Sequence, residues 1–380
     1  MKDRDGLQTG RVETRVEEEF RSPGKEYRPA PFWSWNGRLT PERVKEQVRL
    51  LKEQGFGGYF MHSRIGLITP YLSGEWMAAI VAGVEAAREL DMEAWLYDED
   101  KWPSGFAGGI VPAMKPEYRQ HGLRSRLVDL AEARTALETR PRGQPGQRIF
   151  AYEFEWAEPG RLSAYRRLDG TGALRQDKAH AQPEKQSDQH GSEGTKKTPK
   201  KGYLISEEFT MPTGDEWYNG ECYVDLLDGG VTQAFLDVTH KAYRQVIGKD
   251  FGPHVPGIFT DEPNFRWPLP ADSSPWTPSL PQVFRELHGF DLLDHLPLLF
   301  FDCEDAARIR YCYWQTLLHL FLTNFTIPYS RWCEEHGIAM TGHYLEEDSL
   351  VSQATCIGAA MPHYVYQQLP GIDHLGRNID

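Results

Sequence analysis

The 380-residue sequence has few of the residues and patterns that mark several common protein classes. It holds only five cysteines, none in a C-x-x-C spacing, so neither a disulfide framework nor a zinc knuckle is expected. Its 42 basic residues are outnumbered by 55 acidic ones, and the formal net charge of −13 argues against a nucleic-acid or anionic-membrane partner. No apolar run is long and uninterrupted enough to suggest a membrane span.

Several catalytic motifs are also missing. The sequence has no G-x-S-x-G nucleophile turn, no H-E-x-x-H zinc motif and no EF-hand loop, which leaves little support for a serine hydrolase or a zinc protease. The glycine-rich segment "SGFAGG" lacks the spacing of phosphate-binding loops. The N-terminal segment carries charges throughout and no apolar core of a secretory signal, so a cytoplasmic location is expected.

What the sequence does contain is an alternation of short apolar segments with helical patterns. Strands are expected at residues 30–36, 56–63, 93–100, 255–263 and 338–348, with a weaker sixth at 361–368. A helix is expected to start at Pro41 with Thr40 as its N-cap and Gly55 as its C-cap, and another to span residues 229–248 without a break. This alternation predicts a parallel α/β fold.

The alternation is interrupted in the middle of the chain. Residues 123–218 contain β-like fragments that predict an inserted small β subdomain. Within it, residues 175–202 contain no aromatic residue and no aliphatic residue larger than alanine, so this loop is expected to be disordered. The predicted organisation is strands one to three in residues 1–122, the insertion in 123–218, and strands four to six in 219–380.

Acidic, histidine and tryptophan residues collect where the predicted strands end. Ligands of parallel α/β folds bind at the carboxyl ends of the strands, so these residues are candidates for a site. They are Trp33, Trp35 and Asn36 after the first strand, His62 and Arg64 after the second, Asp98, Glu99, Asp100 and Trp102 after the third, Asp261 and Glu262 after the fourth, His343, Glu346, Glu347 and Asp348 after the fifth, and Gln367 and Asp373 late in the chain.

Individual residues of this set also have plainer interpretations. His62 and His343 could be hydrogen-bonded core histidines, and Trp35 could be a core residue. Asp261 could cap a solvated turn that ends at Pro263. The enrichment at one rim of the predicted sheet favours a binding site over these alternatives.

Six segments resemble the barrel domain of large bacterial glycosidases, similar to the α-L-rhamnosidases of glycoside hydrolase family 106. They are "RPAPFWSWNGRLT", "GFGGYFMHSRIG", "WLYDEDKWPSGFAGG", "GIFTDEP", "TGHYLEED" and "QQLPGID". The resemblance as a whole covers roughly residues 28–113 and 223–373, with the segments in the expected order. The resemblance implies a (β/α)8 TIM-type barrel, glycosidase activity, calcium-assisted sugar binding, and Glu262 as the proton donor. It also implies a glutamate on a seventh strand and further β domains, so the chain is expected to be incomplete at its C-terminus.

The predicted reaction is glycoside hydrolysis by paired carboxylates, with an oligosaccharide or glycoside as the substrate. Glu262 would be the general acid, because burial beside Asp261 raises a carboxyl pKa. Glu346 would be the second carboxylate, or could instead hold a calcium ion. The residues expected to bind substrate are Trp35, His62, Arg64, Asp98, Asp100, Trp102, Asp261 and His343.

Two alternatives stay open. The first is a metal-dependent barrel hydrolase, whose ligands would be His62, Asp98, Asp261, His343 and Glu346 around an activated water. The second is a non-catalytic remnant that binds a sugar.

Overall fold

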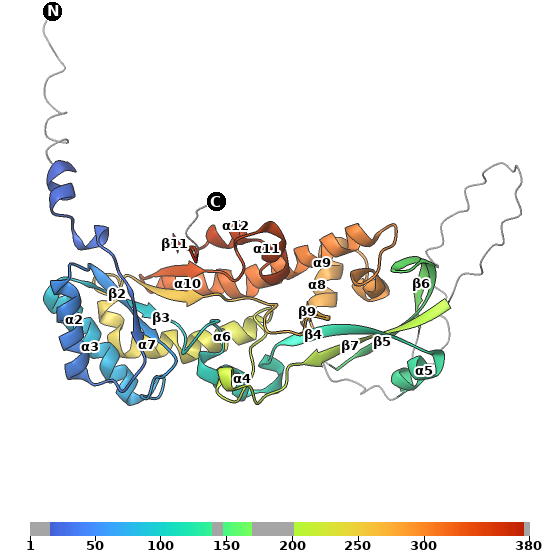
Figure 1. The fold of residues 1–380 in the computed structure, drawn as a ribbon, viewed down its shortest axis with the longest axis horizontal. Coiled ribbons are helices and arrows are strands. Elements are labelled where there is room, and N and C mark those ends of the chain that lie inside the picture. The colour runs from blue at the N-terminus through green and yellow to red at the C-terminus, as the bar shows by residue number, and fades with distance from the viewer. Residues whose placement is uncertain (1–15, 139–146, 169–200, 376–380) are drawn as a thin grey trace, which may run out of the picture.

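A computed structural model of the chain describes residues 16–138, 147–168 and 201–375. It contains two sheets that follow one another along the long axis of the molecule (Figure 1). One sheet is parallel and the other antiparallel. The loop predicted to be disordered lies outside the described residues, apart from Lys201 and Gly202, which begin a strand.

The parallel sheet has six strands in the order β1-β2-β3-β8-β10-β11, and each pairs in parallel with its neighbour. Their bounds are β1 (Phe32–Trp35), β2 (Gly58–Ser63), β3 (Glu93–Tyr97), β8 (Gly257–Asp261), β10 (Ala339–His343) and β11 (Leu369–Pro370). The order in space follows the order along the chain, as in the wall of a barrel. The mixed α/β class with a parallel sheet is confirmed, whereas the described residues do not form a complete eight-stranded barrel.

Most helices of this part start and stop near the predicted positions. In α2 (Pro41–Glu53), the Thr40 hydroxyl accepts a hydrogen bond from the backbone N–H of Arg43 at 3.3 Å, and Gly55 follows the helix with a φ of +88°. The continuous helix predicted at 229–248 is wrong. It divides into α6 (Gly229–Val238) and α7 (His240–Ile247) at Thr239, whose hydroxyl donates to the carbonyl of Phe235, a local bond that competes with a regular helix.

The prediction for residues 361–368 is also wrong. Residues Ala360–Tyr364 form the short helix α12, and the sixth strand follows it as β11. The contacts of His363 explain why this segment is a helix and not a strand. Its buried ring contacts the Thr326 hydroxyl at 2.7 Å and the carbonyl of Ile357 at 3.0 Å. Such tertiary contacts settle the ambiguity of a short segment that mixes apolar and polar residues.

The remaining helices connect the strands of the parallel sheet or flank the second sheet. They are α3 (Gly74–Leu90), α4 (Ile110–Met114), α5 (Leu130–Glu138), α8 (Leu280–His288), α9 (Ala306–Phe321), α10 (Ile327–Glu335) and α11 (Leu350–Cys356). A π-helical stretch, Leu322–Thr326, joins α9 to α10. Among the described residues, no helix combines the length and apolar character needed to cross a membrane.

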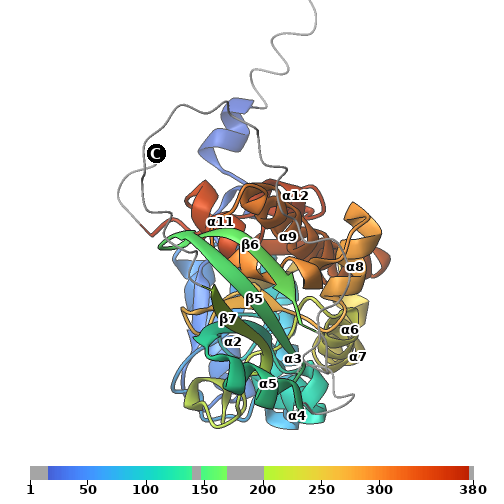
Figure 2. The same ribbon diagram turned by 90° about the vertical axis from the view of Figure 1, so that its right-hand side faces the viewer.

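The antiparallel sheet has the order β6-β5-β7-β4-β9. Figure 2 looks at it from its far end, where β5, β6 and β7 lie in front. The strands are β4 (His121–Val128), β5 (Ile149–Glu158), β6 (Arg161–Arg167), β7 (Lys201–Thr210) and β9 (Ser273–Trp276). Four of them come from the region expected to be inserted, and β9 joins the sheet from a segment that follows β8.

The two faces of the parallel sheet carry different side chains. On the outer face, the Tyr59 hydroxyl donates to the carbonyl of Gly83 in α3 at 2.8 Å, so strand and helix are locked together. On the inner face, Phe32, Phe60 and Phe259 meet with ring centroids 4.8–5.5 Å apart. Contacts among these rings, of which Phe259 is buried and Phe32 is exposed, link β1, β2 and β8.

Candidate active site

An aspartate and a histidine meet at the carboxyl ends of β8 and β10. The parallel register places Asp261 beside His343, and His343 Nε2 lies 3.2 Å from Asp261 Oδ1. The buried Tyr97 hydroxyl, at the end of β3, donates to Asp261 Oδ2 at 2.6 Å. Three strands therefore converge on one carboxylate.

The contact between Asp261 and His343 shifts the pKa of each group in the direction that favours its charged form. Burial alone would raise the pKa of Asp261, but the contacts with His343 and Tyr97 outweigh it and hold the pKa below its usual value. Burial alone would lower the pKa of His343, but Asp261 outweighs that effect and raises it. The pair is thus stabilised as a carboxylate next to an imidazolium.

Glu262, the next residue, has both a raised carboxyl pKa and a left-handed backbone conformation. Burial, followed by the charge of Asp261, raises its pKa to about 7. Its backbone has a φ of +51°, in the left-handed region that non-glycine residues rarely adopt. The strained geometry is held from two sides, because its N–H donates to the carbonyl of His343 at 3.1 Å and its carbonyl accepts from the Asn264 side chain at 3.1 Å. Strain that the surroundings enforce in this way is typical of functional sites.

Gly342 lets the strands approach closely at this point. Its φ is +130°, and a Cβ atom there would lie 1.9 Å from the carbonyl oxygen of Thr260. Glycine is therefore required for β10 to present His343 to the end of β8.

Asp373, which follows β11, completes the cluster. Glu262, His343 and Asp373 each bring one ligand-type atom to within 4.8 Å of the others. Calcium, which the sequence resemblance implied, prefers about six to eight oxygen ligands. Two carboxylates and one imidazole already paired with Asp261 do not provide such a cage, so the residues described here do not fit calcium at this cluster.

The five ligands of the metal-dependent alternative do not form one cluster in the described part of the chain. Asp98 shows why: it is fully buried, and its two oxygens accept hydrogen bonds from the hydroxyls of Ser104 at 2.5 Å and Tyr329 at 3.0 Å. The prediction that Asp98 touches a sugar is therefore corrected, because its side chain points into the protein and supports the loop after β3.

Glu99 organises the same loop. Its buried carboxylate accepts backbone hydrogen bonds from Asp100, Gly105, Ala107 and Gly108 at 2.6–3.1 Å. The glycine-rich segment therefore wraps around a carboxylate of its own chain.

Three other predicted residues surround this loop and the end of β2. Asp100 is half-buried and accepts from the hydroxyl of Ser63 and the amide of Asn219, each at 3.0 Å. His62 is buried between Phe32 and the site, and burial lowers its pKa to about 4, so its ring is neutral. Arg64 is exposed at the rim.

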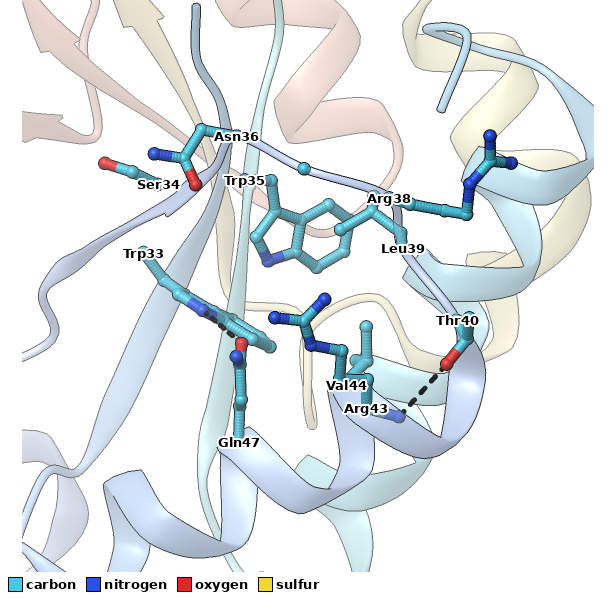
Figure 3. A pocket seen from close by; sticks show the side chains of 11 residues that line it. Trp33, Ser34, Trp35, Asn36, Arg38, Leu39, Thr40, Arg43, Val44 and Gln47 are labelled. Carbon is cyan, nitrogen blue, oxygen red and sulfur yellow. Dashed lines mark hydrogen bonds between the residues drawn. The ribbon is translucent and has the colours of Figure 1, made fainter. Parts of the chain in front are cut away.

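Trp35 does not reach the site. It is 2 % exposed and packs edge-on against Trp76 of α3, so it is a core residue and not a sugar platform. It forms part of the wall of a pocket of about 140 Å³ between β1 and α2 (Figure 3), to which Arg43 and Gln47 also contribute. That pocket contains none of the clustered carboxylates.

Glu346 lies apart from the cluster that Glu262 forms. Its side chain is exposed, with a backbone φ of +59°. Its neighbour Glu347 is tied into the fold, since it accepts from the N–H of Asp373 at 2.6 Å and from the hydroxyl of Tyr364.

The fold resembles that of a solved rhamnosidase. The match is to the structure of the rhamnosidase from Novosphingobium sp. PP1Y, with a TM-score of 0.55 and 14% sequence identity, and it covers 88% of this chain and 47% of that one. The chain therefore spans about half the length of this rhamnosidase, and at such identity the likeness concerns the fold alone. No protein-family model and no curated protein matches the sequence.

The rhamnosidase-like fold gives roles to residues whose roles the sequence did not predict. Tyr97 was hidden in a strand pattern, and only its 2.6 Å hydrogen bond to Asp261 shows its role. Asp373 was among the candidates from the sequence, but it was given no role in catalysis or binding. Glu99 was also among the candidates, but its role as the acceptor for the loop was not predicted, although a glycine-rich loop leaves backbone N–H groups that need an acceptor.

Proposed function

We propose that the chain is part of a glycosidase related to rhamnosidases, with its six parallel strands belonging to an eight-stranded TIM-type barrel. In this proposal Glu262 is the general acid that protonates the leaving-group oxygen. The observation that supports it most is the pKa of about 7 at this half-buried carboxyl, raised first by burial and then by Asp261. A carboxylic acid still protonated near neutral pH is suited to acid catalysis.

The neighbouring groups have complementary roles in the proposal. Asp261 stays ionised because His343 and Tyr97 stabilise its charge, and that charge keeps the proton on Glu262. His343 Nε2 lies 3.9 Å from Glu262 Oε1 and 3.8 Å from Asp373 Oδ2, so it acts on both groups through its charge and not through hydrogen bonds. Asp373 is the second carboxylate in the cluster, and Glu346 is the alternative.

Leaving-group dependence tests the role of Glu262. Glu262→Gln is compared with the parent chain on methyl α-L-rhamnoside and on 2,4-dinitrophenyl α-L-rhamnoside. Loss of the acid should lower kcat on the methyl glycoside by about 10²–10⁴-fold, and far less on the dinitrophenyl glycoside, whose leaving group departs without a proton. An equal loss on both substrates, or no loss, contradicts the assignment.

Two further variants locate the second carboxylate. Asp373→Asn and Glu346→Gln are measured on the same substrates, and the one that carries the base or nucleophile should lose activity on both. A chain that binds the rhamnosides but cleaves neither would favour the non-catalytic sugar-binding alternative. Inactivation by a chelator would favour the metal-dependent one.

A further inference from the structure

Three tryptophans from distant parts of the chain form one cluster. Trp102 follows β3, Trp217 belongs to the short 3-10 helix Glu216–Tyr218, and Trp267 follows β8. The rings of Trp102 and Trp267 are tilted by 32° with centroids 5.2 Å apart, and Trp217 meets Trp102 edge-on at 5.4 Å. The N–H of the Trp217 ring donates to the carbonyl of Trp102 at 2.7 Å, which fixes the cluster.

This cluster is at the surface and not in the core. Trp267 is 37% exposed, the largest exposure among the eleven tryptophans, and Trp102 and Trp217 are half-buried. The core tryptophans Trp76 and Trp276 are buried almost completely. An open group of indoles is costly to expose to water and is typical of a surface that binds a ligand.

The cluster is directly connected to the proposed catalytic residues. Asn264 binds both: its side-chain oxygen accepts from the backbone N–H of Trp267 at 2.7 Å, and its side-chain amide donates to the carbonyl of Glu262 at 3.1 Å. On the other side, Ser104, two residues after Trp102, exchanges two 2.7 Å hydrogen bonds with the backbone of Asp261. The tryptophans are therefore held in a fixed position relative to Glu262.

Polar groups border the rings. The Lys101 ammonium donates to the Asn219 side chain at 3.0 Å and lies 5.8 Å from the centre of the Trp217 ring, and Asn219 also donates to Asp100. Such groups can bond sugar hydroxyls while an aromatic face contacts the apolar C–H side of the ring, which is attracted to the negative ring face.

We propose that Trp102, Trp217 and Trp267 form a second sugar-binding subsite, which takes the sugar residue on the leaving-group side of the bond. This inference rests on the proposed function, in which Glu262 is the general acid. Because a general acid lies next to the leaving-group oxygen and the cluster is anchored to Glu262, the tryptophans lie on the leaving-group side of the bond. The preferred substrates are then oligosaccharides with a terminal sugar on a second sugar ring, and not simple alkyl glycosides.

Calorimetric binding tests the subsite in the full chain carrying Glu262→Gln, which prevents turnover. The probes are methyl α-L-rhamnoside and the disaccharide rutinose, a rhamnose joined to glucose. Trp267→Ala should weaken rutinose binding about three- to tenfold, the size expected for one aromatic contact, and leave methyl rhamnoside binding unchanged. Trp267→Phe should recover most of the affinity, and Trp314→Ala, at another half-buried tryptophan on α9, should change neither.

The other outcomes separate the two proposals. If both probes bind and Trp267→Ala weakens neither, or weakens both equally, the subsite is refuted while the proposed function stands. If neither probe binds, the proposed function is refuted and the subsite with it. Trp217→Ala provides a second variant if Trp267→Ala does not fold, and the same selective loss is expected.

Discussion

Glu262→Gln should change how stability depends on pH, and the size of the effect follows from the structure. The ordinary pKa of this carboxyl is 4.5, and in the folded chain it is about 7. The folded state therefore holds the proton more tightly than the unfolded state, so the free energy of unfolding falls as the pH rises from 4.5 to 7. A difference of about 2.5 pH units corresponds to about 3 kcal/mol, lost by the parent chain and not by the glutamine variant.

Urea unfolding at pH 5 and pH 8 measures this difference. At pH 5 the two proteins should have similar free energies of unfolding, and at pH 8 Glu262→Gln should be the more stable by up to about 3 kcal/mol. The control is Glu346→Gln, at an exposed glutamate with a similar left-handed backbone, which should follow the parent chain. If the parent and Glu262→Gln change in parallel between the two pH values, the raised pKa of Glu262 is refuted.

Three other variants test the surroundings of Glu262. Asp261→Asn removes the charge that raises the pKa of Glu262, so the alkaline limb of kcat/KM should move to lower pH; an unmoved limb would contradict the coupling. Gly342→Ala would place a Cβ atom 1.9 Å from the backbone oxygen of Thr260, at a φ of +130°. It should lower the free energy of unfolding in urea by more than about 2 kcal/mol. An unchanged free energy of unfolding would show that β10 can shift to make room. Glu99→Gln replaces one of the two oxygens that together accept four backbone N–H groups by an amide nitrogen that cannot accept. The change should cost about 2–3 kcal/mol, with faster amide hydrogen exchange at Gly105 and Ala107; unchanged exchange would mean that the loop is held by other contacts.

Local patterns predicted much of the architecture. The alternation of apolar segments with helices indicated a parallel α/β fold, and the cap signals at Thr40 and Gly55 located α2 to within two residues. These signals succeed because they depend on neighbours in the chain. Prediction failed at residues 360–364, where the buried His363 contacts the distant Thr326. It also failed at Thr239, where a local hydrogen bond to the carbonyl of Phe235 accompanies the division of a predicted helix.

In the candidate site, too, the sequence predicted some features correctly and missed others. Parallel strands share one carboxyl edge, so the sequence pointed to the rim where Asp261, Glu262 and His343 meet. It did not show that Asp98 turns inward and Trp35 belongs to the core. The direction of a side chain at the end of a strand depends on the loop that follows, and alternation no longer constrains it there.

The strand segments, the acids that follow them, and the adjacency of Asp261 and Glu262 were determined by the sequence alone, because each is a relation between residues close along the chain. Only the tertiary structure decided that Asp373, and not Glu346, joins Glu262 and His343. It also decided that Tyr97 holds Asp261 and that three separate tryptophans meet beside them. The physical reason is that these contacts link loops whose relative positions are set by packing of the whole sheet, about which local propensity carries no information.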